Sequence, residues 1–331
     1  MNKKWIALLF SLSLCFCMSC SDSESDKKEE GKVEEEKPVT VLSKTVPLAD
    51  PYILVYDSLY YIYGTNVGTG FDVYYSKDLE YWERASALSL SHTNSYGESM
   101  FWAPEVYYVE KDKKFYMFYS TEEHICVATA DSPLGPFKQD EHKPIREEKS
   151  IDTSVFFDED GKAYLYFVRF NDGNVIWCAE LKENLKDNKE QTLTQCFKAE
   201  EPWELVLPKV VEGPSVFKQN GVYYLIYSAN GYTSQDYAVG FATSDSPFGP
   251  WKKYEGNPVL HKCDGLVGVG HGAPFVDMEG KMRYVFHAHK SESEIHPRNS
   301  FVVDMFVKDS IVSLGGNIVR PMVVDRLPSG K

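Results

Sequence analysis

Residues 219–227 read Gln-Asn-Gly-Val-Tyr-Tyr-Leu-Ile-Tyr, and they follow the run Pro-Ser-Val-Phe at 214–217. Asn-Gly is a dipeptide that tight hairpin turns prefer, because both residues tolerate positive φ. Aromatic and β-branched side chains favour strands. The stretch therefore predicts a β-hairpin in which an apolar strand, a tight turn and an aromatic strand follow one another.

The same hairpin pattern recurs along the chain. Aromatic strands at 60–63, 115–119, 164–167 and 284–286 follow turns at 57–58, 111–113, 158–161 and 278–280. The five units start at Asp50, Pro104, Asp152, Glu212 and His271, at intervals of 54, 48, 60 and 59 residues. Repeats of this size in an all-β chain are typical of propeller blades. We predict a five-bladed β-propeller over residues 41–331; a β-sandwich is the alternative, but it does not explain the repeated hairpin.

The remaining features of residues 41–331 agree with an all-β domain. Asp-Ser-Pro-x-Gly-Pro-aromatic occurs twice, at 131–137 and 245–251, near the predicted outer strands. Only residues 181–188 have a helix-like pattern, and that stretch is short. Hydrophobic residues make up 43% and charged residues 25% of the chain, which is the range of globular proteins. We expect residues 311–324 to close the ring.

The first twenty residues are typical of a bacterial export signal. Lys3 and Lys4 precede an apolar run of 14 residues at 5–18, too short to span a bilayer, which needs about 20 residues. Ser19 precedes Cys20, and this end resembles a lipobox, in which the cysteine is acylated. The alternative is an ordinary secretion signal that is cleaved nearby. We therefore expect an outer-membrane lipoprotein, at the cell surface or in the periplasm.

Residues 21–37 hold eight acidic and four basic residues and no aromatic ones. Such a segment cannot bury enough apolar surface to fold, so we expect residues 21–40 to be a disordered tether. The whole chain carries a net charge of −14. Nucleic-acid binders usually present a basic face, so this balance argues against a nucleic-acid partner and suits a neutral sugar.

The cysteines and histidines do not predict a zinc site. Cys126, Cys178, Cys196 and Cys263 lie outside the signal and form no CxxC pair, so we expect buried free thiols. His287 and His289 lie two residues apart, which on a strand places both on the same side. Without a third ligand, we expect these two histidines to hydrogen-bond to the sheet.

Three carboxylates lie at the starts of predicted blades. Asp50, Asp152 and Glu212 each precede an apolar strand, at positions that we interpret as equivalent. The first strands of a propeller line its central channel, so these side chains are expected to converge on the axis. Glycoside hydrolysis uses one carboxylate to deprotonate water and another to protonate the leaving oxygen. Crowding of acids also raises the pKa of one of them, which suits the proton donor.

Five motifs in order resemble those of glycoside hydrolase family 43. They are Ala-Asp-Pro at 49–51, Trp-Ala-Pro-Glu-Val at 102–106, Ile-Asp-Thr-Ser at 151–154, Glu-Gly-Pro-Ser at 212–215 and Gly-His-Gly-Ala-Pro-Phe at 270–275. The resemblance covers about residues 50–275 and implies a five-bladed propeller that cleaves arabinosyl or xylosyl linkages. The repeated Ser-Pro-x-Gly-Pro-aromatic segments also match.

The resemblance implies a role for each carboxylate. Asp50 would be the general base that deprotonates the attacking water, and Glu212 the general acid on the glycosidic oxygen. Asp152 would hold Glu212 in place and raise its pKa. The family inverts configuration, which implies a base-to-acid separation of about 6.5–9.5 Å that admits the water.

The resemblance also suggests residues around these acids. It places His271 near the channel axis, beside a bound calcium ion or a water network, and implies no required cofactor. Trp102 is a candidate for stacking on a sugar ring, and core packing is its alternative. Arg298 is a candidate to reach a substrate hydroxyl or a carboxylate. His271 is a further candidate substrate contact, and a buried structural histidine bonded to the backbone is its alternative.

We predict an inverting glycoside hydrolase that acts on oligo- or polysaccharides of plant origin, similar to an α-L-arabinofuranosidase or a β-xylosidase. One alternative is a galactan- or arabinan-cleaving hydrolase of the same fold, and a fructan-cleaving enzyme would instead retain configuration. A non-catalytic glycan-binding propeller at the cell surface is the alternative from another class. Linkage, and exo or endo action, stay open at this point.

Overall fold

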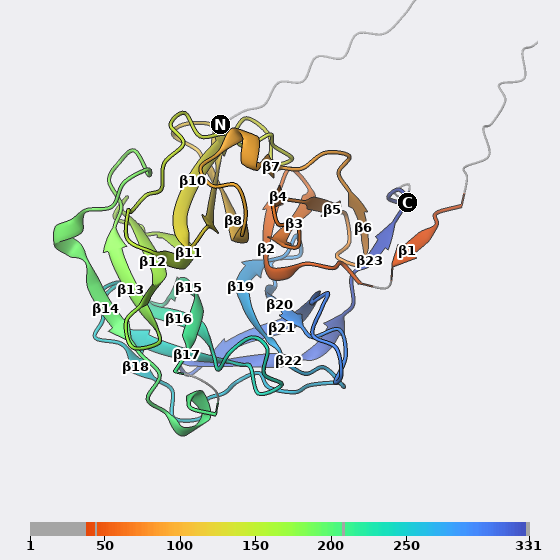
Figure 1. Cartoon of the computed structure of the whole chain (residues 1–331). Helices are drawn as coiled ribbons and strands as arrows, with labels where there is room; N and C mark the ends of the chain where they lie inside the picture. Colours follow the sequence, from red (N-terminus) through yellow and green to blue (C-terminus); the bar gives the residue numbers. More distant parts are fainter. Residues whose placement is uncertain (1–37, 44, 207–208, 329–331) are drawn as a thin grey trace, which may run out of the picture. The chain divides into compact units, whose positions relative to one another are not determined.

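The computed structural model describes residues 38–43, 45–206 and 209–328. The predicted signal and Cys20, and most of the predicted tether, lie outside these residues. From residue 39 onward, five β-sheets are arranged around one axis, with β2, β8, β11, β15 and β19 innermost (Figure 1). The predicted five-bladed β-propeller is confirmed.

Each blade is an antiparallel sheet whose strands follow the chain outward from the axis. Blade I contains β2 (Ala49–Tyr56), β3 (Leu59–Thr65), β5 (Val73–Ser76) and β6 (Tyr81–Arg84), and blade II contains β8 (Trp102–Val109), β9 (Lys114–Thr121) and β10 (His124–Ala130). Blade III contains β11 (Ser150–Phe157), β12 (Ala163–Phe170), β13 (Asn174–Glu180) and β14 (Thr194–Phe197). Blade IV contains β15 (Val211–Gln219), β16 (Val222–Ala229), β17 (Ala238–Ser244) and β18 (Lys252–Lys253), and blade V contains β19 (Gly270–Val276), β20 (Met282–Ala288), β21 (Asn299–Lys308) and β22 (Ile311–Val319).

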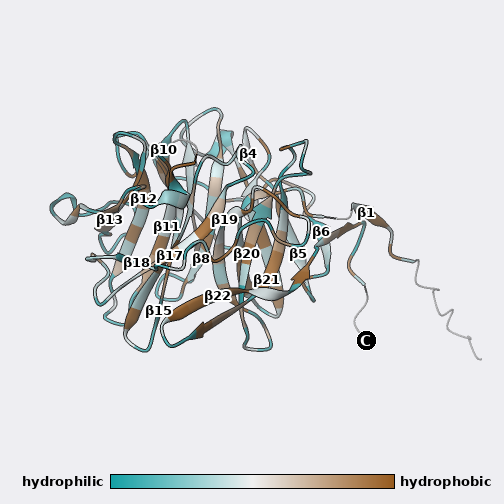
Figure 2. Ribbon diagram, turned by 90° about the horizontal axis from the view of Figure 1, so that it is seen from below, coloured by the Kyte–Doolittle hydropathy of each residue, from teal (hydrophilic) through white to brown (hydrophobic). Residues whose placement is uncertain are grey.

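The core consists of hydrophobic layers between neighbouring blades. In the described part of the chain, five clusters of buried side chains each join residues of two adjacent blades. Hydrophobic colouring follows the strands, whereas the connecting loops are mostly hydrophilic (Figure 2). Burial of apolar area at about 25 cal/mol per Å² is the main force that holds the ring together.

The repeated proline segments connect adjacent blades. The hydroxyl of Tyr63 in blade I donates to the carbonyl of Pro133 at 2.6 Å, and that of Tyr166 in blade III donates to the carbonyl of Pro247 at 2.7 Å. Both tyrosines are fully buried, so each hydroxyl needs such a partner. The two copies of the motif therefore have a structural role.

Blade II has three strands, whereas each of the other blades described above contains four. The segment after β10 covers its outer edge: Lys138 pairs with Thr129, and the side chain of Gln139 donates to the carbonyl of Val127 at 3.1 Å. The same side-chain amide accepts from the backbone of Tyr96 at 2.7 Å. The Gln139 side chain thus satisfies one carbonyl group at the edge of β10 and links that edge to Tyr96 in the loop before β8.

Two other expectations need correction. Residues 181–188 are not a helix but a turn, closed by an isolated bridge between Leu181 and Asn188. Residues 311–324 do not act as one closing segment, because β22 is the outer strand of blade V. Only β23 (Met322–Val324) reaches blade I, where it pairs in parallel with β6, and β1 (Val41–Ser43) pairs with β23. None of the described helical turns is long and apolar enough to cross a membrane.

Candidate active site at the propeller axis

Every innermost strand begins with a bulge. Register shifts interrupt the pairing of each first strand with its second strand, and at each shift one residue has positive φ. These residues are Asp50 (49°), Ala103 (46°), Asp152 (56°), Gly213 (58°) and His271 (37°). Bulges re-aim side chains, and strained backbone of this kind collects at functional sites.

The bulges correct the expectation that the three acids are equivalent. Asp50 and Asp152 occupy bulge positions, but in blade IV the bulge residue is Gly213, and Glu212 precedes it. The physical reason lies in His271: a Cβ added to Gly213 would lie 2.8 Å from atoms of the His271 ring. Only glycine fits there, so the carboxylate comes from one residue earlier.

The backbone amides of the bulge residues donate to the preceding blade. Four of them use a side chain at the end of a second strand: Ala103 to Thr65 (2.9 Å), Asp152 to Ser120 (2.9 Å), His271 to Ser228 (2.8 Å) and Asp50 to His287 (3.1 Å). In register, each acceptor pairs with the residue just before the bulge of its own blade. This ring of hydrogen bonds fixes the bulges relative to one another.

Blade III departs from this pattern. The residue at its equivalent position is Val168, which has no side-chain acceptor. The amide of Gly213 donates instead to Oδ2 of Asp152 at 3.1 Å. Asp152 therefore holds the backbone of the strand that carries Glu212.

The predicted axis residues line one cavity of about 360 Å³. It contains the three acids together with three predicted substrate contacts: Asp50, Asp152, Glu212, Trp102, His271 and Arg298. Its other lining residues include Glu123, Ile151, Phe170, Asn174, Val210, Gly231 and Tyr232. Residues from all five blades thus meet at one end of the axis.

Asp50 is surrounded by cationic and donating groups. Arg298 donates to Oδ1 at 2.9 Å, and the hydroxyl of Thr65 donates to Oδ2 at 2.7 Å. Burial alone would raise the pKa of Asp50, but the charge of Arg298, followed by His271, holds this pKa well below its usual range. Asp50 is therefore ionised at neutral pH. Arg298 was predicted to reach a substrate hydroxyl or a carboxylate, and in the structure it contacts the carboxylate of Asp50.

Glu212 and Asp152 are shifted in the opposite direction. Burial, followed by the charge of Asp152, raises the pKa of Glu212 to about 7. Burial, followed by the charge of Asp50, raises the pKa of Asp152 to about 7. Because the charge of Asp152 contributes to the raised pKa of Glu212, the protonation of one carboxyl affects the other. Near neutral pH this part of the site holds a proton, whereas Asp50 does not.

Two residues that the sequence did not suggest hold the carboxyl group of Glu212. The hydroxyl of Tyr237 donates to Oε1 at 2.9 Å, and the side-chain amide of Asn174 donates to Oε2 at 2.9 Å. The ring of Tyr237 stacks on His287 with centroids 5.6 Å apart. His287 accepts a hydrogen bond from the backbone amide of Asp50. Tyr237, which holds Glu212, is therefore in contact with the histidine that holds the backbone of Asp50.

His287 and His289 each hydrogen-bond to a different backbone group, the amide of Asp50 and the carbonyl of Tyr232. His287 is fully buried, and burial lowers its pKa well below the usual value, so it is neutral. Nε2 of His289 lies 2.7 Å from the carbonyl of Tyr232. A polar residue at the end of an aromatic strand, as in Tyr119-Ser120 or Phe286-His287, is the sequence signal that could have revealed the ring of acceptors.

A second cavity adjoins the first on the side of Asp50. It shares Trp102, Tyr232 and Arg298 with the first cavity and extends along Asn66 and His296. The guanidinium of Arg298 lies 4.4 Å from the centre of the Tyr232 ring. Trp102 thus borders both cavities and is half-buried, which is compatible with a contact to a sugar.

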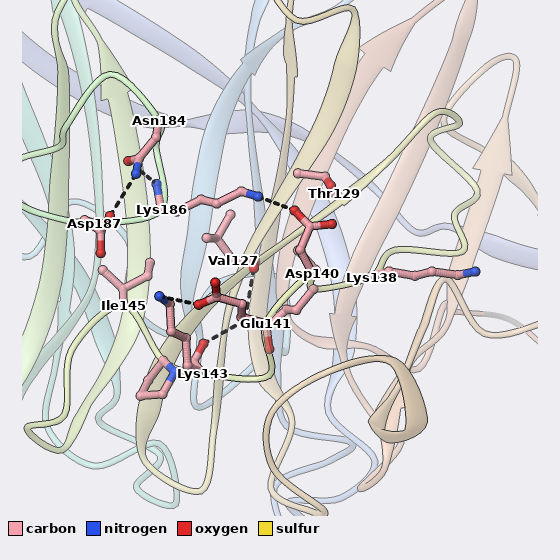
Figure 3. A pocket seen from close by; sticks show the side chains of 13 residues that line it. Val127, Thr129, Lys138, Asp140, Glu141, Lys143, Ile145, Asn184, Lys186 and Asp187 are labelled. Carbon is pink, nitrogen blue, oxygen red and sulfur yellow. Dashed lines mark hydrogen bonds and ion pairs between the residues drawn. The ribbon is translucent and has the colours of Figure 1, made fainter.

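A third hollow lies away from the axis, at the outer side of blade II (Figure 3). Ion pairs line it: Lys186 contacts Asp140 at 2.5 Å, and Lys143 contacts Glu141 at 2.6 Å. It contains none of the predicted site residues. The candidate active site is therefore the cavity at the axis.

The calcium ion that was expected beside His271 can be tested against the residues present. Nδ1 of His271 lies 3.3 Å from Oδ1 of Asp50 and 3.8 Å from Oδ2 of Asp152. Across residues 38–43, 45–206 and 209–328, no group of three or more His, Cys, Asp or Glu side chains is arranged to hold a metal ion. A calcium ion here would depend on water for most of its ligands, and it stays a prediction.

Comparisons with known proteins agree with this geometry. Residues 41–304 match the model of glycosyl hydrolases family 43. The crystal structure of an endo-1,4-beta-xylanase from Bacteroides thetaiotaomicron is 54% identical, with a TM-score of 0.83, and the alignment covers 86% of this chain and 99% of that one. A thermostable family-43 glycoside hydrolase of known structure is 33% identical, with a TM-score of 0.76, over 83% of this chain and 95% of that one.

Among proteins of curated function, a beta-xylosidase from Xylanibacter ruminicola is 33% identical over 210 residues. The alignment covers 54% of this chain and 62% of the xylosidase, which is less than two thirds of that protein's length.

Proposed function

The chain belongs to glycosyl hydrolases family 43 and is a glycoside hydrolase, and from this we propose that it cleaves xylosyl or arabinosyl linkages of plant polysaccharide fragments with inversion of configuration. One observation carries the proposal: a single cavity holds an ionised Asp50 and a Glu212 whose pKa burial and Asp152 raise to about 7. A base and an acid in opposite protonation states are what the reaction needs. The names of the beta-xylosidase and the endo-1,4-beta-xylanase support the choice of sugar.

The proposed reaction is a single displacement. Asp50 takes one proton from a water molecule, whose oxygen forms a bond to the anomeric carbon. The bond from that carbon to the glycosidic oxygen breaks, and Glu212 gives its proton to the departing oxygen. Arg298 and Thr65 orient the base, whereas Tyr237 and Asn174 orient the acid.

Product analysis tests this proposal. The purified chain is incubated with xylan, arabinoxylan, arabinan, arabinogalactan and short xylo-oligosaccharides, and the products are separated by chromatography. We expect xylose, arabinose or their oligomers, and proton NMR of the first-formed sugar should show the anomer opposite to that of the substrate. A first-formed anomer of unchanged configuration would contradict inversion. Saturable binding without product on the whole panel would favour a glycan-binding protein.

We also propose that the chain is a lipoprotein of the outer membrane, facing the cell surface or the periplasm. The support is the sequence alone: two lysines, a short apolar run and a serine before Cys20. Mass spectrometry of the mature N-terminus should find acylated Cys20, and Cys20→Ser should move the protein from the membrane fraction to the soluble fraction. A Cys20→Ser protein that stays in the membrane fraction would contradict the anchor.

A further inference from the structure

The hairpin that joins β12 to β13 lies next to Glu212. In the register of these strands, Phe170 is directly opposite Asn174. Directly opposed residues project to the same face, with Cβ atoms about 4.5–5.5 Å apart. Since Asn174 donates to Oε2 of Glu212 at 2.9 Å, Phe170 is the neighbour of a residue that touches the acid.

This hairpin is fixed to the segment that leads into β15. The backbone amide of Asn174 donates to the backbone carbonyl of Lys209 at 3.0 Å, and Nζ of Lys209 contacts the carboxylate of Asp172 at 2.8 Å. Gly173 has a φ of 113°, and a Cβ there would lie 2.1 Å from the Lys209 carbonyl oxygen. The hairpin tip therefore has a defined position relative to Glu212, as a binding surface requires.

Phe170 is exposed, whereas the other aromatic residues of its strand, β12, are buried. Its exposed fraction is 44%, whereas Tyr164, Tyr166 and Phe167 of the same strand are at most 3% exposed. Phe170 lines the axis cavity together with Ile151 and Val210, so an apolar surface adjoins the side of the cavity that holds Glu212. Because the exposed ring lines the cavity beside Asn174, it is available to contact a ligand there.

The reaction geometry indicates which part of a substrate this ring would contact. The proton of Glu212 must reach the glycosidic oxygen, so the departing sugar has to lie beside Glu212, where Asn174 and Phe170 are. We propose that Phe170 is the stacking platform for the leaving-group sugar and determines specificity for a pyranose with an apolar C–H face, such as a residue of an unbranched 1,4-linked xylan backbone. This inference rests on the proposed function.

The test compares two leaving groups. Phe170→Ala is assayed on xylotriose or a longer xylo-oligosaccharide and on β-xylosyl fluoride, whose leaving group has no ring to stack. We expect kcat/KM on the oligosaccharide to fall about 10- to 100-fold, mainly through KM, and kcat/KM on the fluoride to stay within about 3-fold. Phe170→Trp should keep the activity on the oligosaccharide. Phe306→Ala is the matched control, because Phe306 is 57% exposed on β21, the third strand of blade V, and lines no part of the axis cavity.

The possible outcomes distinguish a failure of the Phe170 platform from a failure of the proposed xylosidic function. Unchanged activity of Phe170→Ala on the oligosaccharide would overturn the platform, and so would an equal loss on both substrates, which indicates damage to the fold or to Glu212. A parent chain that hydrolyses neither substrate would instead overturn the proposed xylosidic function, and the platform would fall with it.

Discussion

Oδ2 of Asp152 accepts a hydrogen bond from the backbone amide of Gly213 at 3.1 Å, one residue beyond Glu212. In the other blades a polar side chain at the end of the preceding second strand accepts the corresponding amide, but in blade III that position is Val168. Asp152 therefore has two roles in the proposed reaction. It fixes the backbone beside the acid, and its charge raises the pKa of the acid.

The pH profile should separate these two roles. Glu212 must be protonated to act, so kcat/KM of the parent should fall as pH rises through about 7. Asp152→Asn keeps an acceptor for Gly213 but removes the negative charge, so the pKa of Glu212 should drop and the alkaline limb should move to lower pH. Asp152→Ala also loses the hydrogen bond and should be less active at every pH. Profiles of kcat/KM from about pH 5 to 9 provide the measurement, and an alkaline limb of Asp152→Asn that stays in place or rises would contradict the assignment.

Replacing the acid and replacing the base should have different consequences for different leaving groups. Glu212→Gln should reduce kcat on oligosaccharides by about 10²- to 10⁴-fold, because positioned proton transfer contributes that much. On aryl glycosides with a good leaving group the same variant should lose little. Asp50→Asn should be impaired on both kinds of substrate, since each needs an activated water. Parallel kinetics on the two kinds of substrate check the pair, and a Glu212→Gln enzyme with parent turnover on oligosaccharides would refute its role as the acid.

Arg298 should act through the protonation state of Asp50. Its guanidinium contacts both oxygens of that carboxylate, at 2.9 and 3.4 Å, a two-point geometry that lysine cannot reproduce. In Arg298→Lys the pKa of Asp50 should rise, so the acid limb of the profile should move to higher pH, and kcat/KM should fall about 10-fold or more for every leaving group. Arg320→Lys, at an exposed ion pair with Asp264, is the control. An acid limb that does not move would mean that Arg298 serves substrate binding alone.

The blades could be predicted from the sequence because their signals are local. A tight turn followed by an aromatic strand, as at Asn220-Gly221 before 222–227, specifies a hairpin within a few residues. Five such turn-and-strand units at similar intervals specify the ring. The cavity could also be predicted, because first strands converge on the axis of a propeller. Asp50, Asp152 and Glu212 therefore meet as expected.

The rest depends on relationships between blades that no local pattern encodes. Asn174, at the start of β13, and Tyr237, just before β17, reach Glu212 from other parts of the chain, and neither stands in a motif of its own. The offset of Glu212 follows from the space that His271 leaves at Gly213, which only the packed structure defines. The edge of the three-stranded blade II is likewise covered by the segment after β10, through contacts of Lys138 and Gln139 that strand propensity cannot indicate.

Glu105 should make the stability of the protein depend on pH. Burial raises the pKa of this carboxyl to about 8, and the hydroxyl of Tyr107 donates to it. A carboxyl whose folded pKa exceeds its unfolded value stabilises the fold at low pH, and this contribution is lost as pH rises from about 4.3 towards 8. Between these pH values the free energy of unfolding of Glu105→Gln should therefore fall less steeply with pH than that of the parent, and the two slopes should differ by about 1.4 kcal/mol per pH unit. Urea unfolding at several pH values measures this slope, with Glu255→Gln at an exposed position as the control. Identical slopes in the parent and in Glu105→Gln would contradict a raised pKa of Glu105.

Gly213 and Gly221 offer a matched pair that isolates the contact with His271. Both have positive φ, 58° and 81°, but a Cβ at Gly213 would lie 2.8 Å from the His271 ring, whereas at Gly221 the described chain has no atom within 4 Å. Gly221→Ala should cost about 1–2 kcal/mol of backbone strain with normal activity. Gly213→Ala should cost about 1–3 kcal/mol more from overpacking, and it should lose activity because the displaced ring of His271 lies 3.3 Å from Asp50. Urea midpoints and kcat/KM of both variants test this prediction. Equal losses of stability in the two variants, with full activity of Gly213→Ala, would show that the ring of His271 moves aside without consequence.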